Sequence, residues 1–236
     1  MIDVRPFSTL GGADHGWLKA RHHFSFANYH DPARMNWGRL RVWNDDEIAP
    51  GTGFDPHPHR DMEIITYVRD GAITHRDSMG NEGRTAAGDV QIMSAGTGVV
   101  HSEYNLEPET TRLFQIWILP DRRGATPNWG SRQFPKERRE AGFEVLASGR
   151  PQDAGKGALP LNVDGAVMAA TLKPGQRLTL PLAPGRAAYL VPARGAVTVN
   201  GVPVGTRDGA AIRDEAAIEI AATQDAELVL VEVAAE

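Results

Sequence analysis

The sequence predicts an all-β protein built as two β-barrels in one chain. Short runs rich in Val, Ile and Thr alternate with turn residues, and the 236-residue chain contains 25 Gly and 16 Pro. This rhythm is typical of β-sheet proteins, and no segment shows the sustained 3.6-residue period of a long helix. Two such blocks follow one another and share a short repeated pattern, which indicates a duplicated barrel.

Strands of the first block are expected where β-branched residues cluster between turn signals. Their ranges are Leu40–Asn44, Glu63–Arg69, Ala72–Arg76, Asp89–Ser94, Val99–Asn105 and Arg112–Leu119. Asp70-Gly71 and Gly80-Asn81 lie between neighbouring runs and predict hairpin turns. A short helix is expected at Pro135–Ala141, just before Gly142. We place the first domain at residues 1–135.

The second block, residues 136–236, contains a polar Gly- and Pro-containing stretch at Ser148–Gly157. Strands are expected after it at Ala166–Leu172, Gln176–Leu182, Ala187–Val191, Ala196–Asn200, Ala210–Arg213, Ala217–Ala221 and Glu227–Val233. Asn200-Gly201 predicts a type I′ hairpin. Tyr67–Thr74 and Tyr189–Thr198 share a strand-turn-strand pattern, which supports the duplication.

Composition excludes several classes of protein. A net charge of −5 argues against direct nucleic-acid binding, which needs a basic surface. Without cysteine the chain forms no disulfide, thiolate metal site or cysteine nucleophile. No apolar run approaches the roughly 20 residues of a membrane helix, and the first residues do not resemble a signal peptide. We therefore expect a cytoplasmic globular protein that does not act at a membrane.

Two tight clusters of metal-binding residue types stand out in the first block. His57 and His59 are separated by one residue, as are His101 and Glu103. In an extended strand, residues at i and i+2 point to the same face. Two such strands side by side would direct three imidazoles and a carboxylate at one point. These ligands suit Fe, Mn, Co, Ni, Cu or Zn, and a metal preferring five or six ligands would keep open positions for substrate or oxygen.

The spacing leaves alternatives open. Glu63 also follows a histidine closely, so spacing alone does not choose between Glu63 and Glu103 as the carboxylate ligand. A closed tetrahedral zinc site would be structural rather than catalytic. His75 lies on a predicted hairpin strand, where we expect it to face solvent. The eight histidines all lie within residues 1–101, so the second domain is expected to bind no transition metal; they are His15, His22, His23, His30, His57, His59, His75 and His101.

Several of these residues match the two motifs of the cupin fold. The first motif, glycine, His-x-His and glutamate, matches Gly51, His57, His59 and Glu63, and the end of the second matches Gly98, His101 and Asn105. The segments 57–63 and 93–105 more specifically resemble the pirin family, two-barrel cupins whose bacterial members include quercetin 2,3-dioxygenases. The segments 15–17, 23–29 and 115–118 resemble the same subgroup, and the resemblance is strongest over residues 10–120.

The resemblance implies a metal in the N-terminal cupin barrel, held by His57, His59, His101 and Glu103, with Glu63 as a supporting residue. It implies one divalent metal ion per chain, with Fe²⁺ expected first and Mn, Co, Ni, Cu or Zn as alternatives. The implied reaction opens the heterocyclic ring of a flavonol such as quercetin with O₂ and releases carbon monoxide. Glu103 would take the proton of the 3-hydroxyl, and the expected pocket residues are Phe24, Phe26, Met93 and Trp117.

The family also implies a second class of function. Pirins include metal-binding regulatory or redox-sensing proteins that act through a protein partner, and the C-terminal cupin barrel, which lacks ligands, could present such a surface. A cupin isomerase or epimerase, which needs no O₂, is a third alternative. We expect a monomer, with a small aromatic substrate and O₂ as its partners in the enzymatic case.

Overall fold

The computed structural model describes residues 1–135, 139–140 and 142–236, which form two β-rich halves. Up to Arg132 the strands are β1 (Ile2–Arg5), β2 (Gly11–Asp14), β3 (Leu18–His22), β4 (Leu40–Ile48), β5 (Thr52–His59), β6 (Glu63–Asp70), β7 (Ala72–Asp77), β8 (Glu82–Ala86), β9 (Val90–Ser94), β10 (Val99–Asn105), β11 (Thr111–Ile118) and β12 (Asn128–Arg132). After it they are β13 (Glu144–Ser148), β14 (Leu159–Pro160), β15 (Gly165–Leu172), β16 (Arg177–Pro181), β17 (Arg186–Arg194), β18 (Val197–Val199), β19 (Val202–Val204), β20 (Gly209–Arg213), β21 (Ala217–Ala222) and β22 (Ala226–Ala234). Short 3-10 helices lie at η1 (Phe7–Thr9), η2 (Pro32–Arg34) and η4 (Pro151–Asp153). The helix expected at Pro135–Ala141 falls on a segment with residues 136–138 and 141 outside the described part.

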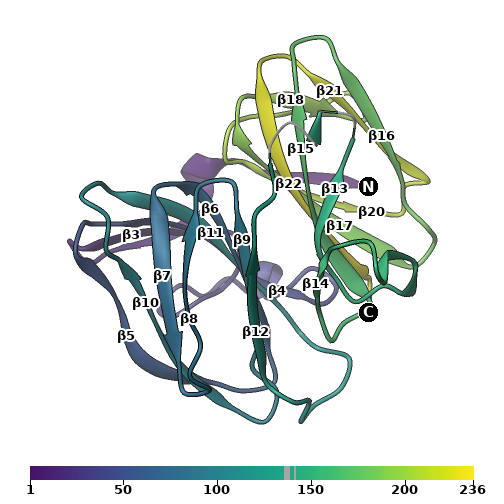
Figure 1. Cartoon of the computed structure of the whole chain (residues 1–236). Coiled ribbons are helices and arrows are strands. Elements are labelled where there is room, and N and C mark those ends of the chain that lie inside the picture. Colours follow the sequence, from purple (N-terminus) through teal and green to yellow (C-terminus); the bar gives the residue numbers. More distant parts are fainter. Residues whose placement is uncertain (136–138, 141) are drawn as a thin grey trace.

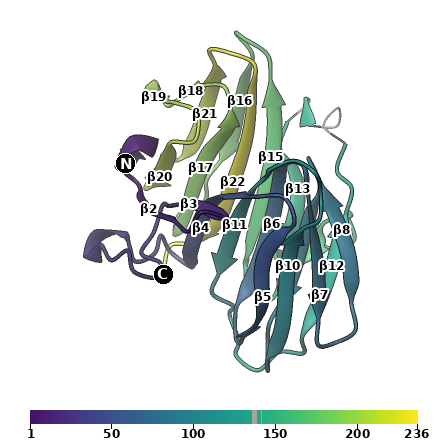
Figure 2. The same cartoon turned by 90° about the vertical axis from the view of Figure 1, so that its left-hand side faces the viewer.

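Each half pairs a seven-stranded sheet with a four-stranded sheet. The first half has the orders β12-β9-β6-β11-β4-β3-β2 and β5-β10-β7-β8. The second half has the orders β1-β20-β17-β22-β15-β13-β14 and β16-β21-β18-β19. The four-stranded sheets lie on the outside, and the two seven-stranded sheets face each other across the middle of the molecule (Figures 1 and 2).

The apolar core explains this layering. One cluster of fully buried side chains joins Ile65 and Phe114 of the first half to Tyr189 and Val231 of the second. Neighbouring strand residues point to opposite faces of a sheet, so the alternate residues of β6 and β11 are free to line the interior of the first barrel. The seam between the halves is therefore a hydrophobic core, and the other face of the first seven-stranded sheet lines the interior of the first barrel.

The sheet orders confirm the internal repeat. Taking β6 and β17 as equivalent, β9 corresponds to β20, β11 to β22 and β4 to β15, and the outer strands β5 and β10 correspond to β16 and β21. Where β5 and β10 carry histidines, β16 and β21 carry apolar side chains, including Leu178, Leu180, Ile218 and Ile220, that join the second barrel's own core. The duplication thus retained the architecture, while the second barrel's interior is apolar at these positions.

The strands predicted from β-branched runs are confirmed, with ends shifted by up to four residues. Nine strands were not predicted: β1, β2, β3, β5, β8, β12, β13, β14 and β19. Most lie at a sheet edge, and β5 contains Pro56 and Pro58. Edge strands tolerate proline and glycine because one side of the ladder needs no partner, so these strands lack the usual sequence signal.

The predicted turns have different outcomes. Asn200 and Gly201, with φ of 46° and 81°, connect the paired strands β18 and β19, as a type I′ hairpin requires. Gly80-Asn81 joins β7 to its partner β8. The prediction of a hairpin at Asp70-Gly71 is wrong, because β6 pairs with β9 and β11, whereas β7 pairs with β8 and β10 of the other sheet. That turn instead carries the chain from one sheet of the barrel to the other.

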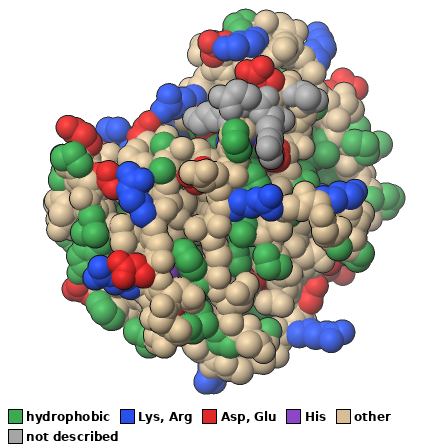
Figure 3. Space-filling model, viewed as in Figure 1, with side chains coloured by type: hydrophobic (Ala, Val, Ile, Leu, Met, Phe, Trp, Pro, Cys, Tyr) green, Lys and Arg blue, Asp and Glu red, His purple; other side chains and the backbone are tan. Residues whose placement is uncertain are grey.

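The first strand crosses to the second half. β1 pairs antiparallel with β20, with Ile2 opposite Ile212, and takes the sheet position that β12 holds beside β9. The boundary drawn at residue 135 remains a proposal, and this pairing places residues 2–5 in the sheet of the second half. No described helix is long and apolar enough to cross a membrane. On the face seen in Figure 3, acidic and basic side chains are interspersed and little histidine is visible.

Candidate metal centre

The pairing of β5 with β10 brings three histidines together. His57 lies opposite His101 across the two strands, and His59 lies opposite Val99. The imidazole centroids of His57, His59 and His101 are 4.5–4.9 Å apart, and each residue offers a ring nitrogen within 4.8 Å of the other two. The i, i+2 spacing thus has the predicted effect, since both members of the His57/His59 pair point into the barrel.

Hydrogen bonding and burial decide whether these ring nitrogens have lone pairs free for a cation. His57 Nδ1 lies 2.7 Å from the Asp55 carbonyl and must donate to it, so a neutral His57 keeps its lone pair on Nε2. Burial, followed by the neighbouring His101 and His57, lowers the pKa of His59 to about 4. Burial, followed by His57 and His75, lowers the pKa of His101 to about 3. Both rings are therefore neutral at pH 7.

These three imidazoles fit a metal ion. His59 Nε2 is buried and has no hydrogen-bond partner in the described part of the chain. His57 Nε2 and His101 Nε2 are 3.1 Å apart, which suits two ligands at right angles, each about 2.0–2.1 Å from one cation. Without a cation, a buried polar atom with no partner costs about 1–3 kcal/mol. The donor set therefore suits a divalent transition metal.

Glu103 is buried behind the histidines and held by three neutral donors. Its Oε1 accepts from Gln91 Nε2 (2.8 Å) and Thr66 Oγ1 (3.2 Å), and its Oε2 accepts from Gln115 Nε2 (2.8 Å). A carboxylate oxygen has two lone pairs. Among the described residues Oε2 has one hydrogen-bond donor, Gln115, so it is the oxygen with capacity left for a proton or a cation.

The four predicted ligands do not form one group in this geometry. His57, His59 and His101 form one candidate set, and Glu103 joins His101 in a second, which His75 completes. The ladder between β5 and β10 shifts register here: His101 lies opposite His57 but Glu103 lies opposite Phe54, so β5 has one extra residue between the two pairs. Glu103 as a fourth ligand remains a proposal, and both sets lie in the first half.

A cavity of about 450 Å³ opens beside His57 and His59. Its wall includes the aromatic side chains of Trp17, Phe26, Phe54 and Trp117. Trp117 packs edge-on against His59 at 5.0 Å and against Phe26 at 5.4 Å. Its Nε1 donates to Gln115, whose amide in turn holds Glu103. The aromatic wall is thus tied to both the histidines and the carboxylate.

Other expected site residues lie elsewhere. Phe24 is fully buried in the core between the halves, packed against Tyr189, and Met93 is buried with Ile64 and Val99; neither is among the residues lining this cavity. Glu63 is buried and accepts hydrogen bonds from Ser94 Oγ (2.6 Å) and Asn162 N (3.1 Å).

The expectation that Glu63 supports the ligands fails because residues 60–62 break the strand between His59 and Glu63. On β6, Thr66 points into the first barrel and contacts Glu103. Glu63 is three residues earlier on the same strand, so its side chain points to the opposite face, toward the second half. The even spacing between His59 and Glu63 therefore does not place their side chains on the same face.

The prediction that His75 faces solvent is also wrong. His75 is 0% exposed, and its neighbours in space are His101 and Asp77. The sequence did contain a signal for an inward-facing His75, because His75 and Asp77 repeat the i, i+2 spacing of the other two clusters. The polar residues that face Glu103 and the cavity, Asn44, Asp46, Thr66, Gln91 and Gln115, were missed because single polar residues within strands have no distinctive spacing.

Asp46, on the cavity wall, is expected to make stability pH-dependent. Its side chain is 3% exposed and its Oδ1 lacks a hydrogen-bond partner among the described residues. Burial, then the charges of Asp45 and Glu103, raises the pKa of Asp46 well above its usual range. A raised folded-state pKa means that stability is full below the unfolded value of about 3.9 and falls by about 1.4 kcal/mol per pH unit from there up to the folded-state pKa.

The substitution Asp46→Asn removes the ionisable group and should therefore remove the loss of stability that Asp46 causes as pH rises. Urea unfolding at pH 4 to 7 should show the variant losing less stability than the unaltered protein as pH rises. Asp225→Asn, at a carboxylate that is 72% exposed, serves as the matched control and should follow the unaltered protein. Parallel pH curves for Asp46→Asn and the unaltered protein would contradict the assignment.

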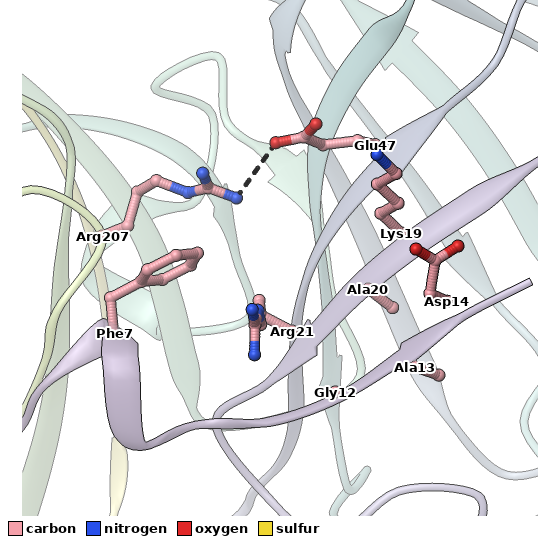
Figure 4. A pocket seen from close by; sticks show the side chains of 9 residues that line it. All are labelled: Phe7, Gly12, Ala13, Asp14, Lys19, Ala20, Arg21, Glu47 and Arg207. Atoms are coloured by element: carbon pink, nitrogen blue, oxygen red, sulfur yellow. Dashed lines mark hydrogen bonds and ion pairs between the residues drawn. The ribbon is translucent and has the colours of Figure 1, made fainter. Parts of the chain in front are cut away.

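A second cavity, of about 420 Å³, lies where the N-terminal segment meets the second half (Figure 4). Arg207 reaches from the second half over the ring of Phe7, 4.1 Å from its centroid, and its Nη2 lies 3.4 Å from Glu47 Oε1. Lys19 and Arg21 also line this cavity. These contacts link the halves, and none of the residues lining the cavity is a histidine.

The chain is similar to known protein families and solved structures over nearly its whole length. Residues 3–118 match the family model Pirin, and residues 145–233 match the Quercetinase C-terminal cupin domain. A pirin-like protein of Caulobacter vibrioides is 66% identical, over 99% of this chain and 100% of its own. A quercetin 2,3-dioxygenase of Escherichia coli is 45% identical, over 98% of this chain and 97% of its own. The structure of the E. coli bacterial pirin YhhW in complex with nickel(II) has a TM-score of 0.94 at 43% identity and covers all of both chains.

Proposed function

The chain belongs to the pirin family of two-domain cupins, and on this premise we propose that it is a metal-dependent dioxygenase that opens the heterocyclic ring of a flavonol such as quercetin. The observation that carries the proposal is the group of three clustered imidazoles, His57, His59 and His101, two of which line an aromatic-walled cavity. A quercetin 2,3-dioxygenase among the relatives supports the choice of substrate. The products would be the ring-opened ester and carbon monoxide.

His57, His59, His101 and Glu103 are the proposed ligands. The bound metal would act as a Lewis acid for the 3-hydroxyl and 4-carbonyl oxygens of the flavonol and provide an open position for O₂. We propose Fe²⁺ as the native ion, while the nickel(II) in the relative supports a divalent transition metal without selecting iron.

The chain's own residues would bind, orient and deprotonate the substrate. The cavity volume of about 450 Å³ falls within the 300–1,000 Å³ usual for small-molecule sites. Trp17, Phe26, Phe54 and Trp117 would pack against the flat rings and exclude water. Glu103 would accept the proton of the 3-hydroxyl on Oε2, while Gln91, Thr66 and Gln115 hold the carboxylate in position.

The test is O₂ uptake by protein reconstituted separately with Fe²⁺, Mn²⁺, Co²⁺, Ni²⁺ or Cu²⁺ and supplied with quercetin. We expect O₂ consumption with release of carbon monoxide for at least one metal. Luteolin, which lacks only the 3-hydroxyl, is the matched control and should not react, because it presents neither the proton nor the chelating oxygen pair. No uptake with any flavonol and metal would overturn the proposal in favour of the regulatory alternative, and equal uptake with luteolin would exclude the mechanism.

A further inference from the structure

A buried chain of three side chains leads away from the metal centre through His101. His101 Nδ1 lies 3.4 Å from His75 Nδ1, and His75 Nε2 lies 2.9 Å from Asp77 Oδ2. His75 and the side chain of Asp77 are 0% exposed, and His101 is 2% exposed. Backbone pairing sets the order, because His75 lies opposite Glu103 and Asp77 opposite His101 where β7 meets β10.

From this geometry we propose that Asp77 and His75 are positioning residues that fix the tautomer of His101, so that its Nε2 presents a lone pair to the metal. This inference rests on the proposed metal centre and is independent of the identity of the substrate. Neither residue touches the metal or the substrate in the proposed arrangement.

The proton positions follow from donor and acceptor counts. A neutral imidazole has one N–H and one lone pair. The Asp77 carboxylate only accepts, so a neutral His75 donates to it from Nε2–H and keeps its lone pair on Nδ1. His101 must then donate from Nδ1–H to His75, which leaves the lone pair of His101 on Nε2, facing His57 Nε2 at 3.1 Å. A carboxylate two side chains away thus determines which nitrogen of the ligand is free.

Asp77 is fixed in the orientation that this role needs. Its Oδ1 accepts from the backbone N–H groups of Met79 (2.9 Å) and Asn81 (3.0 Å), and the Asn81 side-chain amide donates to Oδ2 (2.9 Å). The turn between β7 and β8 therefore anchors the carboxylate, while Oδ2 faces His75.

The plane of His75 is fixed as well. Trp129 stacks on it with centroids 4.9 Å apart and planes 13° apart. Gly83 lies opposite His75 on β8, and a Cβ atom at Gly83 would lie 2.2 Å from the Trp129 ring. Only glycine leaves room for this stack, so the three strands β7, β8 and β12 together hold the imidazole against His101.

The substitution Asp77→Asn offers a sharp test. The two backbone N–H groups cannot reverse, so the amide oxygen should remain at Oδ1 and the NH₂ group should take the place of Oδ2, with the Asn81 amide turning over. The new donor would require His75 to accept on Nε2 and donate from Nδ1, and His101 to accept on Nδ1. His101 Nε2 would then carry the proton, as in the wrong-tautomer effect of the same substitution in a serine protease triad.

Two measurements read this out separately from turnover. In the metal-free full chain, ¹⁵N–¹H NMR of the histidine rings should show His101 protonated on Nδ1, and protonated on Nε2 in Asp77→Asn. In a chelator competition, Asp77→Asn should bind Ni²⁺ about 10–100-fold more weakly, the usual effect of losing an outer partner of a ligand. Asn81→Ala, which removes a donor but keeps the carboxylate, is the matched control and should change neither result.

His75→Phe is the second variant if Asp77→Asn does not fold. It retains the stack on Trp129 and removes both hydrogen bonds, so it should also weaken Ni²⁺ binding and leave the His101 tautomer mixed. An Nε2-protonated His101 in the unaltered protein would overturn the inference. So would folded Asp77→Asn or His75→Phe with unchanged tautomer and affinity. A protein that binds Ni²⁺ in this way but does not consume flavonols would contradict only the proposed function.

Discussion

His101→Ala is expected to abolish metal binding. The alanine removes the imidazole whose Nε2 lies 3.1 Å from His57 Nε2 and whose other nitrogen faces His75. Losing an outer partner alone typically weakens a site about 10–100-fold, so losing a ligand should weaken Ni²⁺ binding by more than about 100-fold. O₂ uptake with quercetin should disappear in parallel.

Metal analysis of the purified protein after a chelator wash, together with Ni²⁺ titration, measures this loss. His30→Ala is the matched control, since His30 is an exposed histidine outside both candidate metal groups, and it should retain the full metal content. Thermal unfolding of the metal-free forms separates ligand loss from misfolding. Equal metal content in His101→Ala and His30→Ala would refute the site.

Glu103→Gln is expected to slow turnover by about 10²–10⁴-fold, the usual effect of losing a general base. Glutamine keeps the size of the side chain and removes the negative charge that would accept the 3-hydroxyl proton. Because the aromatic wall formed by Trp17, Phe26, Phe54 and Trp117 is unchanged, KM should change less than kcat. Steady-state kinetics on samples of matched metal content measure the split.

Glu63→Gln provides a control of identical chemistry. Glu63 is also buried, but its carboxylate is held by Ser94 and Asn162 at the seam with the second half. The Glu63→Gln variant should therefore turn over quercetin at the rate of the unaltered protein. A large loss in Glu63→Gln with little change in Glu103→Gln would mean that the wrong carboxylate has been assigned.

The sequence predicted the parts of this molecule that rest on strong local patterns. The strands of both cores were predictable because continuous Val and Ile runs reflect burial on both faces of a sheet. The His57/His59 and His101/Glu103 pairs were predictable as inward-facing sets because strand alternation is a geometric constant.

The remainder depends on contacts between distant segments. The edge strand β5 contains two prolines, and the break between His59 and Glu63 reverses which residues of β6 face the site. The structure groups Glu103 with His101 and His75 rather than with His57 and His59, which the spacing of His101 and Glu103 does not indicate. His75 was misplaced because its burial depends on Trp129, more than 50 residues away, and on the small size of Gly83.

The pairing of β1 with β20 has a consequence for how the molecule is made. Ile2 is synthesised well before its strand partner Ile212, which lies 210 residues further along the chain. Contacts of such high sequence separation form slowly, because a long loop must close before they contribute. The first barrel can begin to assemble during translation, but β1 has to stay unpaired until β20 of the second half is available. Closure of that last seam would then complete the folding of both halves together.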